Sequence, residues 1–144
     1  MIRNKYLFYL LSFTWGLPMT LIGCVVGAIL RAKGHKPKKW GYCYYFEVGE
    51  NWGGVNFGPI FITNKNSTDH TKSHEHGHAF HNCRFGIFMP FVVSIPSAIR
   101  YWYMTISVKM GKPCKMNYYD VWFESQASDL GIQFMNWYNT HQND

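Results

Sequence analysis

Two histidines and a glutamate in the middle of the chain have the types and the spacing that metal-dependent hydrolysis requires. His74, Glu75 and His78 form the pattern H-E-x-x-H. On a helix, positions four residues apart lie on the same face, so both imidazoles can point at one metal ion. Glu75 then lies about 100° around the helix from His74, where it can reach a metal-bound water without binding the metal itself. The pattern predicts a zinc site with Glu75 as the general base.

A catalytic zinc site needs a third protein ligand and an open fourth position. The best candidate is Glu124, in a stretch that reads as a second helix beginning near Asp120, a typical N-cap, and ending at Gly131. Apolar neighbours at spacings of three and four place Glu124 on a face that is otherwise buried. A buried carboxylate is costly without a positive partner, which a zinc ion would supply. Small Ala127, one turn on, would let the two ligand-bearing helices approach closely.

Three other histidines lie near the motif. His81 is a rival third ligand, because it is seven residues after His74 and on a similar face. However, it lies roughly 10 Å along the helix axis from His74, whereas zinc–nitrogen bonds are only about 2 Å long, so one ion cannot easily be held by both. His76 points away from the ligand face, and His70 precedes His74 by a turn. Both are expected to be solvated or to lie behind the ligands.

The two motifs together resemble a known class of enzymes. H-E-x-x-H at positions 74–78, followed on a later helix by Glu124-x-x-Ala127, is similar to the gluzincin class of zinc metallopeptidases, and to small bacterial membrane proteins of that type. The resemblance spans residues 51–131. It implies that His74, His78 and Glu124 bind one zinc ion and that Glu75 activates water for peptide hydrolysis.

One position departs from that class. Several gluzincins carry an aspartate four residues after the glutamate ligand, where it orients a zinc-binding histidine; here that position is Ser128, and the acid follows at Asp129. Groups of this kind change metal affinity by about 10- to 100-fold. Ser128 and Asp129 are therefore candidates for the orienting role. The departure leaves open an inactive zinc-binding regulatory or structural membrane protein, or a metal-handling protein whose histidine-rich run, residues 70–81, binds ions loosely.

The N-terminal region is predicted to lie in a membrane. Residues 6–30 contain no charged side chain and, at about 1.5 Å each, are long enough to cross a hydrocarbon core of roughly 30 Å. We expect a transmembrane helix within residues 1–32, in which Gly16 and Pro18 cause a kink rather than a break. A signal peptide is the alternative, but the apolar run is long for one and lacks a clear cleavage site. Residues 33–144 would then form a membrane-associated, zincin-like metal-binding domain.

A second apolar stretch, residues 85–99, contains a glycine and two prolines and predicts a short or re-entrant membrane segment. Arg100 and the three aromatic residues after it are typical of a membrane interface. Five basic residues follow the first apolar run and only two precede it, which places the metal site on the cytoplasmic side, and the resemblance suggests a bacterial inner membrane. The scattered cysteines agree with a reducing compartment.

The net charge of +6 comes mainly from the basic loop after residue 30. A short basic run beside an apolar helix is explained more simply by contact with anionic lipid than by nucleic acid, and no nucleic-acid-binding motif accompanies it. We therefore expect membrane lipid and a peptide or protein substrate as partners, and no nucleic acid.

Between the two apolar stretches the pattern changes to strands. Residues 41–48 and 55–63 are aromatic and β-branched runs joined by a glycine-rich connection, which predicts a β-hairpin or small sheet and an α+β fold. Pro59 cannot donate a ladder hydrogen bond, so the second strand is expected at an edge or with a bulge.

The resemblance also suggests where a substrate binds. An edge strand over residues 56–62, with Asn56, Phe57 and Gly58 at its start, would pair with an extended peptide. A hairpin that only covers the metal helix is the alternative. Candidates to stabilise the oxyanion are Arg100, Tyr118 and Tyr119, among which the sequence does not choose.

Overall fold

The computed structural model describes residues 1–112 and 120–141. In chain order the elements are α1 (Lys5–Phe13), α2 (Leu17–Ala32), β1 (Lys38–Trp40), β2 (Cys43–Glu47), β3 (Gly54–Phe57), β4 (Ile60–Thr63), α3 (Asp69–Phe85), a 3₁₀ turn η1 (Gly86–Phe88), a π-helical turn η2 (Pro90–Ser94), α4 (Ile95–Lys109) and α5 (Trp122–Thr140). The predicted α+β class is confirmed. In these residues the fold consists of five α-helices and one mixed four-stranded sheet.

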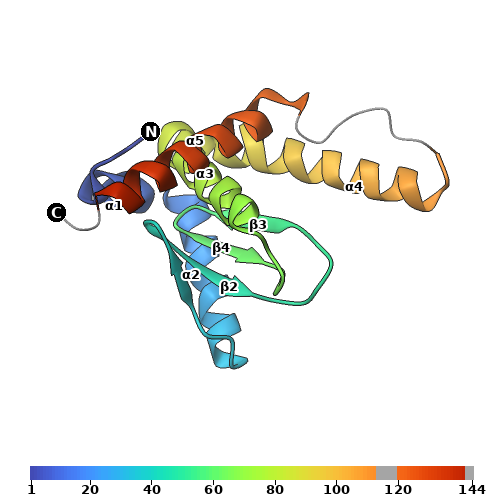
Figure 1. Ribbon diagram of the computed structural model, residues 1–144, viewed down its shortest axis with the longest axis horizontal. Coiled ribbons are helices and arrows are strands. Elements are labelled where there is room, and N and C mark those ends of the chain that lie inside the picture. Colours follow the sequence, from blue (N-terminus) through green and yellow to red (C-terminus); the bar gives the residue numbers. More distant parts are fainter. Residues whose placement is uncertain (113–119, 142–144) are drawn as a thin grey trace.

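Helix α3 is the central element of the molecule. It packs against α5 along one side and against β3 and β4 along the other (Figure 1). Thr68 caps its first turn, because the Thr68 hydroxyl accepts a hydrogen bond from the backbone N–H of Thr71. Eleven consecutive residues, Ser73–Cys83, are buried. The H-E-x-x-H motif therefore lies in the buried middle part of α3.

The sheet differs from the predicted hairpin. Its strand order is β1-β2-β4-β3, and β2 pairs with β4 in parallel, whereas the other two pairs are antiparallel. The expected second strand over residues 55–63 is in fact two strands, because the chain reverses at Gly58 and Pro59. Gly58 has a φ of 72°, which favours glycine, and in a turn Pro59 has no ladder bond to donate. The hairpin is thus β3–β4, and β3 is one of the two edge strands of this sheet.

The N-terminal apolar run is broken where a kink was predicted. α1 and α2 are bent by 93° relative to each other. Pro18 lies in the first turn of α2, and its ring would clash with the carbonyl of residue 14 in a continuous helix, so α1 ends at Phe13. Among the described residues no single helix is both long and apolar enough to cross a membrane; by length and composition, two bent pairs reach that threshold, α1 with α2 and residues 69–88 with 90–109.

Helix α5 is longer than predicted and begins one residue later. Its N-cap is Val121 rather than Asp120, and Gly131 lies in its interior. The glycine serves close packing and does not end the helix: a Cβ at Gly131 would lie 1.7 Å from the backbone oxygen of Ser73 on α3. In the same way, a Cβ at Gly77 would lie 1.8 Å from the backbone oxygen of Ala127. The close approach expected at Ala127 is confirmed.

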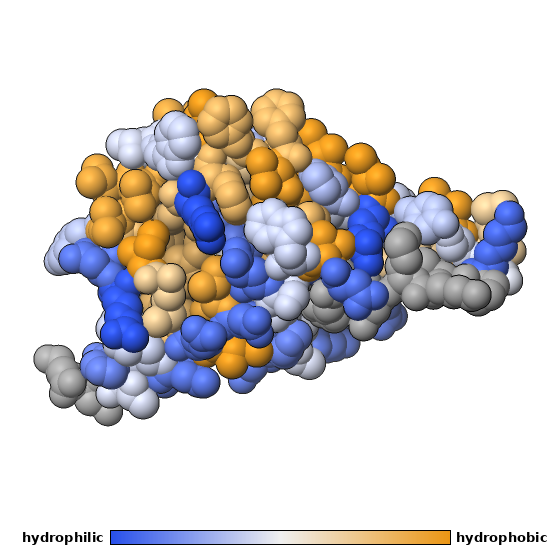
Figure 2. Space-filling model, turned by 90° about the horizontal axis from the view of Figure 1, so that it is seen from above, coloured by the Kyte–Doolittle hydropathy of each residue, from blue (hydrophilic) through white to orange (hydrophobic). Residues whose placement is uncertain are grey.

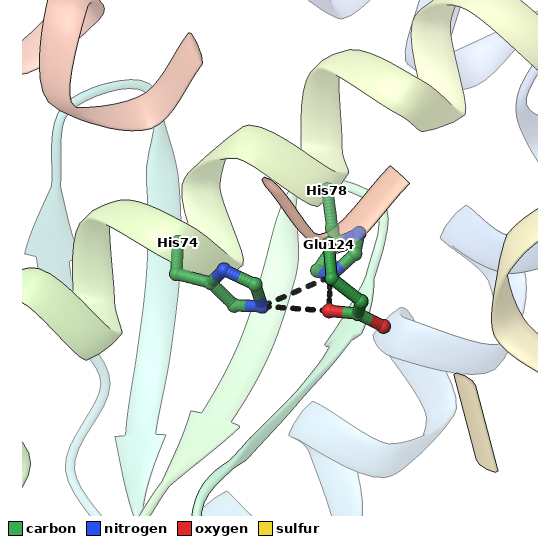
Figure 3. Close-up of side chains that lie close together, drawn as sticks. All are labelled: His74, His78 and Glu124. Atoms are coloured by element: carbon green, nitrogen blue, oxygen red, sulfur yellow. Dashed lines mark hydrogen bonds and ion pairs between the residues drawn. The ribbon is translucent and has the colours of Figure 1, made fainter. Parts of the chain in front are cut away.

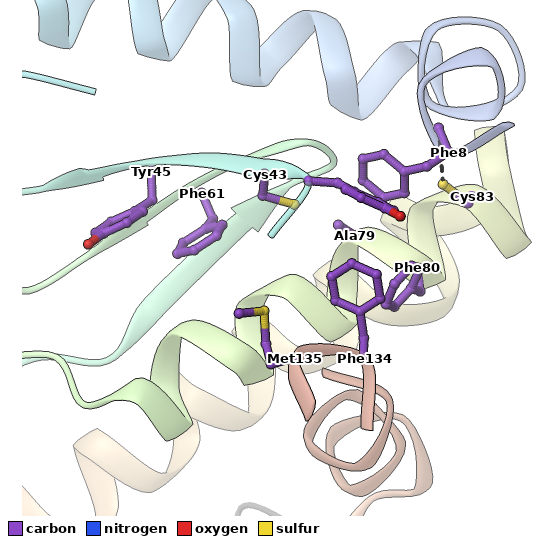
Figure 4. Packing of buried hydrophobic residues seen from close by; sticks show 10 residues of the cluster. Phe8, Cys43, Tyr45, Phe61, Ala79, Phe80, Cys83, Phe134 and Met135 are labelled. Atoms are coloured by element: carbon purple, nitrogen blue, oxygen red, sulfur yellow. Dashed lines mark hydrogen bonds between the residues drawn. The ribbon is translucent and has the colours of Figure 1, made fainter. Parts of the chain in front are cut away.

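An aromatic core holds the back of α3 in place (Figure 4). Buried side chains from α1, the sheet, α3 and α5 form this cluster: Phe8, Tyr42, Cys43, Tyr45, Phe61, Ala79, Phe80, Cys83, Phe134 and Met135. His76 packs into it, with its ring stacked 4.4 Å from that of Phe134, and its Nε2 accepts a hydrogen bond from the backbone N–H of Tyr42. Burial lowers the pKa of His76 to about 3. His76 is therefore a neutral core residue and is not solvated.

Candidate metal centre

Three ligand atoms from two helices converge in the middle of the molecule (Figure 3). His74 Nε2 lies 3.1 Å from His78 Nε2 and 3.1 Å from Glu124 Oε2, and the remaining side, from His78 Nε2 to Glu124 Oε2, is 3.3 Å. All three side chains are buried, and Glu124 is completely enclosed. His74, His78 and Glu124 form a buried group that could hold a metal ion.

The helix crossing lies directly beneath these donors. Gly77 sits between the two histidines on α3, and Ala127 is one turn after Glu124 on α5. Because these two residues allow the backbones to touch, the Glu124 side chain reaches the imidazoles across the gap. A larger residue at position 77 would separate the two histidines from the carboxylate.

Ser128 supports His74 from behind. His74 Nδ1 lies 2.8 Å from Ser128 Oγ, and the Ser128 hydroxyl donates a 3.3 Å hydrogen bond to the backbone oxygen of Glu124. Since that proton is already used, the serine oxygen accepts from His74 Nδ1–H, so that a neutral His74 carries its lone pair on Nε2. Asp129, the other candidate for this role, is exposed and borders a small surface cavity with His70, Ser125 and Ser128.

His78 has a different support, which sequence reasoning missed. Its Nδ1 lies 3.3 Å from Nδ1 of His81, and His81 Nε2 lies 3.0 Å from Gln126 Oε1. His81 is fully buried behind His78, as its spacing of three residues on a helix allows. Two features of the sequence could have indicated this contact: the spacing of three residues between His78 and His81, and the polar residue Gln126 two positions after Glu124.

The charges in the site favour a cation. Burial opposes ionisation of Glu124, but hydrogen bonds to His74 and His78 outweigh it and hold the pKa of its carboxyl below the ordinary value. Burial acts against protonation of His74, and the bond to Glu124 still raises the pKa of that imidazole. Burial raises the pKa of Glu75, against the opposing effect of His74 and His78. Burial and the neighbouring His78 lower the pKa of His81 to about 4.

Glu75 is buried but borders two cavities that open beside the triangle. One has a volume of about 230 Å³ and also touches His78; the other has a volume of about 580 Å³ and also touches His74. Both are bounded by Gly54 on β3 and Tyr101 on α4. A Cβ at Gly54 would lie 2.5 Å from Glu75 Oε1, so a larger residue there would displace the carboxylate from its present position. Apolar side chains line the smaller cavity: Val55, Met89, Val93, Ala98 and Trp102.

The other predicted substrate-binding residues lie in different places and do not form one site. Asn56 borders the smaller cavity, but its amide donates to the backbone oxygens of Gly58 and Glu75 and so ties β3 to α3. Phe57 packs on the apolar cluster that contains Met19 and Met89. Gly58 lies at the hairpin turn.

The predicted edge segment, residues 56–62, is wrong beyond Phe57, because β4 is paired on both sides. Of the oxyanion candidates, Arg100 is half-buried and lines neither of the two cavities, and Tyr118 and Tyr119 lie outside the described residues. Tyr101, one of the aromatic residues predicted at a membrane interface, borders both cavities.

Comparisons of the chain with protein-family models, with curated proteins and with solved structures find no match. Any assignment of function therefore depends on the residues and the geometry described above.

Proposed function

We propose that this protein is a membrane-associated zinc metallopeptidase that hydrolyses peptide bonds with Glu75 as the general base. The observation that carries the proposal is the triangle of donor atoms from His74, His78 and Glu124, with sides of 3.1–3.3 Å. A tetrahedral zinc ion with bonds of about 2.0–2.1 Å separates its ligand atoms by about 3.3–3.4 Å. The side chains therefore fit such an ion with almost no rearrangement.

The donor types favour zinc over other common cations. Two imidazole nitrogens and one carboxylate oxygen form a set that catalytic zinc sites use, whereas magnesium and calcium prefer oxygen ligands. Three protein ligands also leave the fourth tetrahedral position for water or substrate. Ser128 and His81 support the imidazoles from behind, as is usual for zinc-bound histidines.

A bound zinc ion supplies a Lewis acid that makes water acidic near neutral pH and polarises the scissile carbonyl. Glu75 accepts a proton from the attacking water and then delivers it to the leaving amine. Its position supports this role, because it follows His74 directly, stays outside the triangle and borders both cavities. The bond from Asn56 to the Glu75 backbone ties β3 to this part of α3, and Gly54 leaves room for the carboxylate beside the strand.

The space between β3 and α4 supports an extended peptide as the substrate. The outer edge of β3 pairs with no other strand among the described residues, so its backbone can bind a peptide by β-augmentation. The two cavities flank Glu75 along this edge and would receive side chains on either side of the scissile bond. Because Tyr101 lies between them, its ring is the candidate to contact the substrate at the reacting centre.

The surface supports the membrane part of the proposal. Hydrophobic side chains gather along one side of the molecule and hydrophilic ones along the other (Figure 2). Large exposed apolar side chains come from α1, α2, η1, η2 and α4, among them Leu10, Phe13, Val25, Ile29, Phe88, Phe91, Ile99 and Val108. Exposed apolar area of this extent is typical of lipid or protein contact. We assign it to lipid, with the metal site on the cytoplasmic side of a bacterial inner membrane.

The sharpest test of the function replaces the general base. Glu75→Gln keeps the size of the side chain, and we expect it to retain one zinc per chain while peptide hydrolysis falls by about 10²- to 10⁴-fold. Elemental analysis and turnover of a peptide library by the full-length, detergent-purified protein measure the two effects. Glu50→Gln, at an exposed glutamate in the connection before β3, is the matched control and should change neither.

Three other results would contradict the proposal, and each would indicate a different role for the protein or for Glu75. Undiminished hydrolysis by Glu75→Gln would refute the role of Glu75. One zinc per wild-type chain without any turnover would instead favour a zinc-binding regulatory or structural protein. More than one zinc per chain, insensitive to Glu124→Ala, would favour a metal-handling protein.

A further inference from the structure

The two zinc-binding imidazoles have unlike supports. Ser128 holds His74, whereas His78 is held by another histidine, His81, whose far nitrogen contacts Gln126. Gln126, His81 and His78 form a chain of contacts that runs from α5, through the buried side of α3, to the triangle of donor atoms. Neither His81 nor Gln126 belongs to the group of converging ligand atoms.

The positions of the protons follow from the contacts. Gln126 Oε1 can only accept, so His81 carries its proton on Nε2, 3.0 Å away. His81 Nδ1 then has a free lone pair, and the 3.3 Å contact between the two Nδ1 atoms requires the proton to be on His78. In a neutral His78, Nε2 is thereby left without a proton. That atom is a corner of the triangle.

The opposite orientation of the Gln126 amide would prevent His78 from binding a metal ion. If the amide nitrogen of Gln126 faced His81, every bond in the chain would reverse, and the proton would lie on His78 Nε2, where a metal ion must bind. The orientation with the amide oxygen toward His81 is therefore the only one that suits a metal site.

We infer that Gln126 and His81 are positioning residues that select the metal-binding tautomer of His78 and so strengthen metal binding. This inference depends on the zinc site of the proposed function, but not on peptide hydrolysis. A carboxylate or a backbone carbonyl usually supports a zinc-bound histidine; here a neutral imidazole takes that place, oriented in turn by an amide.

Burial makes the support hard to replace. His81 is fully enclosed, and its ring contacts those of Phe85 and Trp122 at centroid distances of 5.8 and 6.4 Å. Water cannot easily take the place of its Nδ1. Loss of that acceptor would leave the Nδ1–H of His78 buried without a partner, or would let the proton move to Nε2 and compete with the metal.

Zinc affinity, measured by competition with a chromogenic chelator on full-length protein, tests the chain of contacts. We expect His81→Phe, which keeps a ring but removes the acceptor, to weaken zinc binding by about 10- to 100-fold. Gln126→Leu should cause a smaller loss, and Gln126→Glu, which still accepts from His81, should cause none. Gln133→Leu, at an exposed glutamine on the same helix, is the matched control.

Two further variants separate positioning from a purely structural role. His81→Gln again offers an acceptor to His78 and should recover most of the lost affinity. In the double variant His81→Phe with Gln126→Leu, binding should be no weaker than with His81→Phe alone, because Gln126 acts only through His81. Additive losses, or full affinity in His81→Phe, would overturn the inference.

The tautomers themselves can be read by ¹⁵N NMR of histidine-labelled protein, with and without zinc. We expect the proton on Nε2 of His81 and on Nδ1 of His78 in the wild type, and a loss of this preference at His81 in Gln126→Leu. A proton on Nδ1 of wild-type His81 would contradict the proposed chain. Zinc binding that ignores Glu124→Ala would instead contradict the metal site, so the two failures can be told apart.

Discussion

Helices α3 and α4 follow one another in the chain, separated only by η1 and η2, and they reverse the usual rule of protein interiors. α3 is rich in polar residues, yet its stretch Ser73–Cys83 is entirely buried. α4 is largely apolar, yet none of its residues is buried. Buried polar groups and exposed large apolar patches are the informative deviations from ordinary burial. The buried polar groups of α3 agree with the metal site proposed above, and the exposed apolar side chains of α4 agree with the proposed contact with lipid.

The difference also shows how each helix is held. Three histidines of α3 have polar partners on α5: His74 contacts Glu124 and Ser128, His78 contacts Glu124, and His81 contacts Gln126. Burying an ionisable group without such a partner would cost several kcal/mol. α4 has no comparable set of buried contacts, so its apolar side chains gain stability only when something else covers them.

The largest expected contrast in stability is between two phenylalanines. Phe134 on α5 is fully buried against α3, and Phe134→Ala should lower the free energy of unfolding by about 3–5 kcal/mol. Phe91, in η2 just before α4, is 69% exposed, and Phe91→Ala should change that free energy by less than about 0.5 kcal/mol. Denaturant unfolding of both variants under the same conditions measures the difference.

Binding to lipid vesicles should be affected more by Phe91→Ala than by Phe134→Ala, the reverse of their order in stability. If the exposed apolar surface of η2 and α4 contacts lipid, Phe91→Ala weakens flotation with anionic vesicles, whereas Phe134→Ala affects it only through unfolding. A Phe91→Ala variant that is strongly destabilised would mean that this surface is covered within the protein, and the contrast between the two helices would fail.

A smaller effect is expected where α3 and α5 cross. Gly131→Ala would place its Cβ 1.7 Å from a backbone oxygen of α3, which cannot move alone, and should cost about 1–3 kcal/mol of stability. By separating Glu124 from the histidines it should also weaken zinc binding. Thermal unfolding with and without zinc measures both effects. In Gly53→Ala the added Cβ has no neighbour within 4 Å, and an equal loss there would remove the crossing as the explanation.

The smallest of these effects concerns the support of His74. Ser128→Ala removes the acceptor of His74 Nδ1–H and should weaken zinc binding by about 10-fold, which is about 1.4 kcal/mol. Asp129→Ala changes an exposed neighbour and should leave the affinity as it is. Chelator competition on both variants decides between them. If only Asp129→Ala were impaired, the acid would be the support after all.

Much of the architecture was predictable from local patterns. The α+β class, the helical H-E-x-x-H segment and a second helix around Glu124 follow from residue spacing and composition. The errors at Gly131 and in residues 55–63 have one cause. In both places the local pattern allowed two structures, and contacts with distant residues favoured the one that was not predicted. Gly131 is a typical helix end, but on α5 it makes room for the α3 backbone. Residues 55–63 resemble one strand, but Gly58 and Pro59 turn it so that β4 can pair with β2 in parallel.

The sequence by itself determined the pair of histidines and the neighbouring glutamate, because their relation depends only on the geometry of one helix. It also determined the apolar character of the segments around them. Only the tertiary structure decided that Glu124 meets the two imidazoles, that Ser128 rather than Asp129 lies behind His74, and that His81 and Gln126 lie behind His78. Those contacts join residues far apart in the chain, and they exist because small residues let α3 and α5 cross at van der Waals distance beneath the site.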